Sequence, residues 1–358
     1  MKKTKTTFFY FIFLLMIITG SALPQEQKEG FKPSGKVWGM VFGDIYYKAA
    51  GDTTGSFVGE YTKTDVYKNA FDFRRIYLGF NYEISEKFSS EFIAAFEGTD
   101  YLPNGKRSLY VKIANIKWKD IYPNATLVLG QLSTPTFSYT SEKLYGYRWL
   151  EKTILDMKGI ASSHDFGLAI LGKFDQEGKY GYNLMIGNGR GALVENNKFK
   201  KYYAGLYGYF WDKKILADVY SDYEDINSNK NKTTLKSFIG FQTPEVRIGF
   251  EIFNQLYRRF YSDGSNKSTF GFSIFSAATL IENKIYAFGR FDYVDPDLNH
   301  SDLGYKENFL IVGADFVFDK NIHFMPNLWV NIYKDKSAAN VERKADIVPR
   351  LTFYYLYK

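Results

Sequence analysis

The sequence has no cysteine and only 3 histidines among its 358 residues. Without thiols the chain cannot form a disulfide scaffold, a Cys-ligated zinc or iron–sulfur centre, or a lipid anchor on an N-terminal cysteine. The histidines, His164, His300 and His323, are scattered, and no serine and acid can be assigned as catalytic partners of His323. We therefore predict that the protein is not an enzyme and has no cofactor.

A complete calcium-binding motif is also missing. Asp295, Asp297 and Asn299 have the spacing of a calcium loop, but His300 and Lys306 stand where a glycine and a bidentate acid are required. We predict that the protein holds no metal ion.

Long apolar runs are absent apart from one near the start of the chain. Residues 8–19 are almost all apolar, but a helix that crosses a bilayer needs about 20 apolar residues. Three lysines precede this run and three small residues, Gly-Ser-Ala, follow it, which is the pattern of a cleaved signal peptide. The predicted parts of the chain are a signal peptide, a short periplasmic N-terminal segment and one large domain, at residues 1–22, 23–35 and 36–358.

The sequence carries no strong net charge of either sign. Removing the three signal-peptide lysines lowers the formal net charge from +7 to +4. A mildly basic, exported protein gives no reason to expect a nucleic-acid partner.

What the sequence does contain is alternation of apolar and polar residues with a period of two. Val246, Ile248 and Phe250, for example, alternate with Arg247 and Glu251. Successive side chains of a strand point to opposite faces, so this pattern predicts strands with one apolar face. The predicted strands are 36–47, 71–84, 88–98, 108–119, 124–131, 165–174, 179–187, 200–210, 214–223, 233–242, 246–257, 268–279, 284–294, 306–317, 323–333 and 347–357.

Short turns and longer polar connections alternate strictly between these predicted strands. Outer-membrane barrels keep short periplasmic turns and longer external loops, whereas a soluble sandwich has no reason to do so. We therefore predict an all-β fold, a transmembrane antiparallel β-barrel of about 16 strands in the outer membrane of a two-membrane bacterium. The alternative is a secreted, soluble β-sandwich or barrel with surface tyrosines. Sixteen strands leave an aqueous channel in the barrel.

The third long connection, between Leu132 and Asp165, has the only helix signal of the predicted loops. Six apolar residues recur near helical spacing after Ser141, with Gly159 as a C-terminal stop; they are Leu144, Trp149, Leu150, Ile154, Leu155 and Met157. An apolar helix must bury itself, so we expect this loop to fold inward and narrow the channel. Packing on the outer mouth or on a neighbouring protomer is the alternative.

Five short motifs lie between residues 71 and 210. They are Phe73-Arg74-Arg75-Ile76-Tyr77-Leu78-Gly79, Leu129-Gly130-Gln131-Leu132-Ser133-Thr134-Pro135, Glu151-Lys152, His164-Asp165-Phe166-Gly167-Leu168 and Gly187-Asn188-Gly189-Arg190-Gly191. In order and spacing they resemble the opening strand, the Gly-Gln-x-x-x-Pro stretch, the Glu-Arg pair, the Arg-Asp-Ile-Gly segment and the Asn-Gly-x-Gly loop of the phosphate-selective porin O and P family. This resemblance implies a trimeric, sixteen-stranded outer-membrane porin that passes small anions such as phosphate.

Strand parity predicts which basic residues face the lumen. If the aliphatic face meets lipid, four arginines point inward as pore-lining, anion-binding residues: Arg75, Arg247, Arg290 and Arg350. Five acids fall on the same side and weaken their field: Glu83, Glu91, Glu251, Asp292 and Asp315. Four cations of the third loop would line the constriction: Lys143, Arg148, Lys152 and Lys158. The arginines are about equally well explained as braces that pair with acids across the wall.

We predict a porin for passive diffusion of small hydrophilic solutes, with a weak anion or phosphate preference. Its expected partners are outer-membrane lipid, lipopolysaccharide, small anions and two further copies of itself. The alternative is a non-channel barrel with an adhesive or structural role through its external loops, which are short for independent binding domains.

Overall fold

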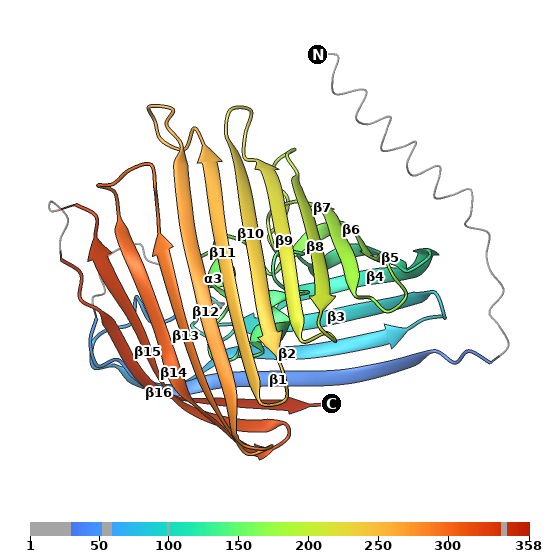
Figure 1. The fold of residues 1–358 in the computed structure, drawn as a ribbon, viewed down its shortest axis with the longest axis horizontal. Coiled ribbons are helices and arrows are strands. Elements are labelled where there is room, and N and C mark those ends of the chain that lie inside the picture. The colour runs from blue at the N-terminus through green and yellow to red at the C-terminus, as the bar shows by residue number, and fades with distance from the viewer. Residues whose placement is uncertain (1–29, 52–58, 99–100, 338–341) are drawn as a thin grey trace.

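The chain folds into a closed antiparallel barrel in which each strand pairs with its neighbours in sequence, and the first strand, β1 (Ser34–Tyr47), pairs with the last, β16 (Asp346–Tyr357) (Figure 1). The computed structural model describes residues 30–51, 59–98, 101–337 and 342–358. The predicted signal peptide and most of the predicted 23–35 segment lie outside these residues, so those two predictions remain untested. No helix of the described chain is long and apolar enough to cross a membrane.

The sixteen strands of the described residues confirm the sixteen predicted ones, and their ends agree to within a few residues. In chain order they are β1 (Ser34–Tyr47), β2 (Asn69–Glu83), β3 (Phe88–Glu97), β4 (Tyr110–Tyr122), β5 (Ala125–Ser133), β6 (His164–Lys173), β7 (Tyr180–Gly187), β8 (Lys201–Phe210), β9 (Ile215–Asp225), β10 (Asn231–Gln242), β11 (Val246–Arg258), β12 (Lys267–Ile281), β13 (Ile285–Asp295), β14 (Tyr305–Asp319), β15 (Ile322–Asp335) and β16 (Asp346–Tyr357).

The two faces of the wall differ as the alternation predicts. On β11, Ile248 and Phe250 are 43% and 38% exposed on the outside, whereas Glu251 on the inner face is 2% exposed. The outer face therefore offers apolar side chains to lipid, and the polar side chains are collected inside the barrel.

The barrel closes where the last strand meets the first. β16 and β1 pair from Gly39↔Tyr357 to Tyr46↔Arg350. The Tyr357 ring lies directly over Gly39, where a Cβ atom would collide with it. A glycine at this position lets the aromatic ring cover the seam.

The predicted alternation of loop lengths holds with one exception. The connection between β9 and β10 was predicted to be long, but it spans only residues 226–230, whereas the turn between β6 and β7 spans 174–179. The difference arises because β9 and β10 extend further than their apolar pattern suggests, with Lys232 paired to Glu224 at 3.1 Å. A cross-strand ion pair stabilises a polar hairpin end that apolar periodicity does not detect.

Two strand pairs depart from regular register in mid-strand, both on the same side of the barrel. Between β1 and β2 the register passes from Phe42↔Arg75 to Gly43↔Phe73, which leaves Arg74 as an extra residue. A bulge of this kind allows two consecutive side chains to face the same way, and Arg74 and Arg75 are both buried inside the barrel.

The second bulge lies between β3 and β4. Here the register passes from Ile93↔Ile113 to Ala94↔Val111, so Lys112 is the extra residue. Lys112 and Ile113 are consequently both buried. Each bulge therefore brings an additional cation to the inner wall.

The third long connection, residues 134–163, lies within the ring of strands (Figure 1). The prediction of a single helix there is wrong. The segment contains two short helices, α2 (Ser141–Tyr145) and α3 (Ile154–Met157). α2 ends at Gly146, which adopts a left-handed φ of 63°. A side chain at this position would also collide with the Arg247 guanidinium. Five of the six apolar residues of the predicted helix are buried and Trp149 is half-buried, so the apolar face is present but divided into two pieces.

Candidate channel constriction

The third loop is held inside the barrel by apolar contacts with the wall. α2 packs against β10 and β11, and α3 packs against β12. Tyr145 and Tyr147 lie with ring centroids 4.9 Å and 5.2 Å from those of Phe275 and Phe288 on the wall. The loop therefore lies against the inner wall in this structure, and burial of its apolar side chains favours that position.

Cations of the wall donate hydrogen bonds to backbone carbonyls of the same loop. Arg74 and Arg350 both reach the Leu150 carbonyl, at 3.0 Å and 2.5 Å. Arg290 donates to the Lys152 carbonyl, and Lys236 donates to another loop carbonyl at 2.8 Å. Four cations from β2, β10, β13 and β16 thus fix the path of the loop across the lumen.

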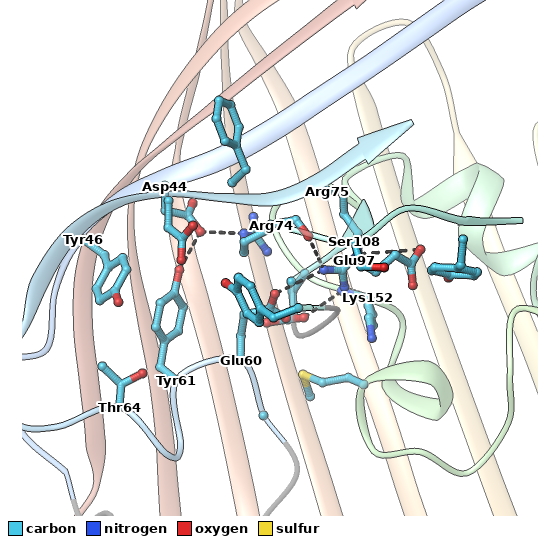
Figure 2. Close-up of a pocket in the computed structure, with 18 of the residues that line it drawn as sticks. Asp44, Tyr46, Glu60, Tyr61, Thr64, Arg74, Arg75, Glu97, Ser108 and Lys152 are labelled. Atoms are coloured by element: carbon cyan, nitrogen blue, oxygen red, sulfur yellow. Dashed lines mark hydrogen bonds and ion pairs between the residues drawn. The ribbon is translucent and has the colours of Figure 1, made fainter. Parts of the chain in front are cut away.

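Asp44 on β1 pairs with both arginines that donate to the Leu150 carbonyl. Figure 2 shows Asp44 beside Arg74. Its carboxylate lies 2.5 Å from Arg74 Nε and 3.4 Å from Arg350 Nη1, and it accepts a hydrogen bond of 2.5 Å from Tyr61. Thr352 donates to its other oxygen. These contacts hold both arginines in place around one buried carboxylate.

A second charged group surrounds Glu97 at the end of β3. Arg75 lies 3.8 Å from Glu97 and 3.3 Å from Glu60 of the first long loop, and Lys112 also pairs with Glu97. Figure 2 shows Arg75 between the two acids. Burial of Glu60 acts to raise its pKa, but Arg75, Arg74 and Lys152 lower it to about 2. Glu60 is therefore an anion at neutral pH.

The loop cations predicted to line the constriction have different surroundings. Arg148 pairs with Glu142 and, at 2.7 Å, with Asp156, so its charge is balanced within the loop. Lys158 lies 2.6 Å from Glu307 on β14, and its side chain is 6% exposed. The ammonium group of Lys152 lies 3.9 Å from the Asp156 carboxylate. Lys143, the fourth of these cations, is exposed.

Two acids of this loop, Glu142 and Asp156, have opposite pKa shifts. Burial raises the pKa of Glu142, and Arg148 offsets this only in part. Burial also acts to raise the pKa of Asp156, but Arg148 and Lys152 outweigh it and hold that pKa below its usual value. Glu142 is therefore the first of the two to take up a proton as the pH falls.

The four wall arginines chosen by parity lie on the inner face, and three of them pair with acids. Arg75 pairs with Glu60 and Glu97, Arg350 with Asp44, and Arg290 with Asp292 at 2.5 Å. Arg247 differs, because its guanidinium lies 5.1 Å from the centroid of the Tyr147 ring and none of the ion pairs among the described residues includes it. Strand parity missed Arg74 and Lys112, since a bulge reverses parity and carries no apolar signature.

The third loop borders cavities on both of its sides. A cavity of about 820 Å³ at the long-loop end is lined by Glu151, Lys152 and Met157 of the loop. Two cavities of about 700 Å³ and 510 Å³ lie at the short-turn end, and loop residues such as Tyr147 and Tyr139 line them. The loop therefore lies across the lumen between two vestibules.

The Gly187–Gly191 motif is not a phosphate-binding loop. The backbone N–H groups of Gly189, Arg190 and Gly191 donate to the Asp165 carboxylate at 2.6 to 3.2 Å, and Tyr203 donates to it as well. The anion that this segment binds is a side chain of the barrel itself.

A closed barrel of this strand number, with an apolar outer face, a charged lumen and an inward-folded third loop, is the fold of porin-type outer-membrane β-barrels. The predicted outer-membrane location agrees with this class. No protein-family model matches the chain, and no curated protein is significantly similar to it in sequence.

Solved structures share the fold. The outer membrane channel DcaP of Acinetobacter baumannii is 11% identical, with a TM-score of 0.66 over 94% of this chain and all of its own. The anion-selective porin from Comamonas acidovorans is 10% identical, with a TM-score of 0.63 over 91% of this chain and all of its own. The outer-membrane protein OmpT of Vibrio cholerae is 10% identical, with a TM-score of 0.62 over 93% of this chain and all of its own. These likenesses establish the fold.

Proposed function

We propose that the protein is a porin that allows passive diffusion of small hydrophilic solutes across the outer membrane. The observation that supports this most directly is the position of the third loop, which borders a cavity at each end of the lumen. Such a loop narrows a channel without replacing it by a solid core. Because the loop lies across the lumen, its cations would border the narrowed part of the channel.

We further propose a weak preference for anions, phosphate included, rather than strict phosphate selection. The wall arginines are largely neutralised by Asp44, Glu60, Glu97 and Asp292. Partly balanced charge gives only a small excess field, because an ion in the lumen interacts with both signs. One of the similar structures is described as an anion-selective porin, which supports the same direction.

The proposed assembly is a homotrimer in contact with lipid and lipopolysaccharide. One solved structure with this fold is described as a trimer form of OmpT of Vibrio cholerae. Absence of enzyme activity remains a prediction that belongs to the channel proposal. The adhesive alternative is less well supported than the channel, because the cavities and the third loop lie in the lumen.

Planar-bilayer recording tests the channel proposal. The detergent-purified protein should give discrete conductance steps, and a potassium chloride gradient should give a small reversal potential with the sign of anion preference. Added phosphate should change the current only modestly. A folded protein, shown by a heat-modifiable band in electrophoresis, that inserts without conducting would contradict the proposal.

A further inference from the structure

The cavity of about 700 Å³ at the short-turn end contains an arginine that the barrel leaves without an acid. Arg247 lies in its wall, half-buried, and has no carboxylate partner among the described residues. Its guanidinium faces the Tyr147 ring at 5.1 Å. A guanidinium presents a planar fork of N–H donors that matches a carboxylate, so an arginine without an acid inside a channel is suited to a planar anion from solution.

The same cavity has an aromatic wall supplied by the third loop. Trp149 lies edge-on to Tyr147, with ring centroids 5.7 Å apart, and stacks on Tyr354 at 4.3 Å. The indole Nε1 of Trp149 is buried and has no hydrogen-bond acceptor within the described chain. These rings are already fixed by one another, so they can contact a flat apolar ligand at little entropic cost.

None of the acids that line the cavity forms an ion pair with Arg247. Asp315 accepts a hydrogen bond from Tyr147 at 3.3 Å and lies 2.9 Å from His323 Nδ1. The remaining charges belong to the short turns and balance in number; they are Lys284, Lys320, Glu245 and Asp319. Within the described part of the chain, Arg247 therefore has no acid in direct contact, and its N–H donors are not taken by a carboxylate of the cavity. A volume of this size is within the usual range of small-molecule sites.

We propose that this cavity binds small aromatic carboxylates, with the carboxylate on Arg247 and the ring against Tyr147 and Trp149. The inference rests on the proposed diffusion function and names a solute class for it. An inorganic anion can use Arg247 but gains nothing from the rings, and a neutral aromatic molecule gains nothing from Arg247. Benzoate should therefore bind more tightly than phosphate, cyclohexanecarboxylate or benzamide.

Two measurements on the full-length protein test this proposal, with benzoate as the probe. Saturation-transfer NMR in detergent reports binding whether or not the protein conducts, and single-channel recording reports block of the current. Arg247→Gln should weaken benzoate binding by about tenfold or more, the effect of losing one charge-assisted hydrogen-bonded contact. Arg247→Lys, which keeps the charge but loses the fork, should give an intermediate loss.

The matched control is Lys284→Gln, which removes one positive charge from the rim of the same cavity and should leave benzoate binding nearly unchanged. Equal losses in the two variants, or equal binding of cyclohexanecarboxylate and benzoate, would overturn the proposal. If the protein binds benzoate through Arg247 but never conducts, only the diffusion function fails. If it conducts without binding benzoate, only this inference fails.

Discussion

The wall formed by β2 and β4 differs from the wall formed by β10 to β13 in how it supplies charge to the lumen. On β2 and β4, bulges add Arg74 and Lys112 to the inward-facing side chains, so cations gather around Glu97 and Asp44. On β10 to β13 the register is regular through mid-strand, and Arg290 is followed by Asp292 on the same face.

The two walls therefore use their lumenal cations differently. We call β10 to β13 the regular wall and β2 to β4 the bulged wall. On the regular wall each paired cation is braced by one or two neighbouring acids and by the third loop, which leaves little charge for a passing ion. On the bulged wall several cations share acids, and Arg75 lines the long-loop cavity together with Glu60 and Glu97. We therefore expect stability to depend more on the regular wall and ion selectivity to depend more on the bulged wall.

Removal of the loop that joins the two walls should have the largest effect. Deleting residues 138–158 removes both short helices and the carbonyls that Arg74, Arg290 and Arg350 contact. Single-channel conductance should rise because the segment between the vestibules is gone, and the barrel should unfold at a lower temperature. Unchanged conductance in a folded variant would place the loop outside the path of the ions.

Arg290→Ala should destabilise the barrel more than Arg74→Ala. Loss of Arg290 leaves buried Asp292 without its partner, which costs about 3–5 kcal/mol. Loss of Arg74 leaves Asp44 with Arg350 and other donors, so we expect only about 1–3 kcal/mol. Thermal unfolding in detergent measures the difference. Arg258→Ala, at an exposed strand end, is the control, and the reverse order of the two losses would refute the assignment of roles.

Ion selectivity should respond in the opposite order. Arg75→Gln leaves Glu60 and Glu97 less compensated, so the reversal potential should move toward cations, with a change in permeability ratio of about two- to fivefold, or ~0.4–1 kcal/mol. Lys236→Gln, on the regular wall, removes a side chain that is 0% exposed and should move the potential less. A larger shift for Lys236→Gln would mean that the bulged wall does not border the ion path.

The smallest expected effect is a dependence of selectivity on pH. The pKa of Glu142 is raised by burial, so this acid is neutralised first as the pH falls and leaves Arg148 less compensated. Anion preference should therefore increase as the pH drops through that raised pKa, and Glu142→Gln should remove this component. Glu60, with its pKa of about 2, stays ionised over the same range, and its contribution to stability is lost only at more acidic pH.

Parts of the candidate constriction could be predicted from the sequence. Parity placed Arg75, Arg247, Arg290 and Arg350 on the inner face, because each strand with one apolar face has only one way to meet lipid. It could not find Arg74 or Lys112, since a bulge is a local register change set by the neighbouring strand. It also could not show which arginine lacks an acid, because the partners come from other strands and loops.

The sequence alone determined the number, order and inward faces of the strands, and it marked the loop that folds into the lumen. These features follow from local periodicity and from the need to bury apolar side chains or expose them to lipid. The tertiary structure decided the bulges, the break of the loop helix at Gly146 and the pairing of Arg74 and Arg350 with Asp44. Those features depend on distances between residues far apart in the chain, and such distances exist only once the barrel has closed.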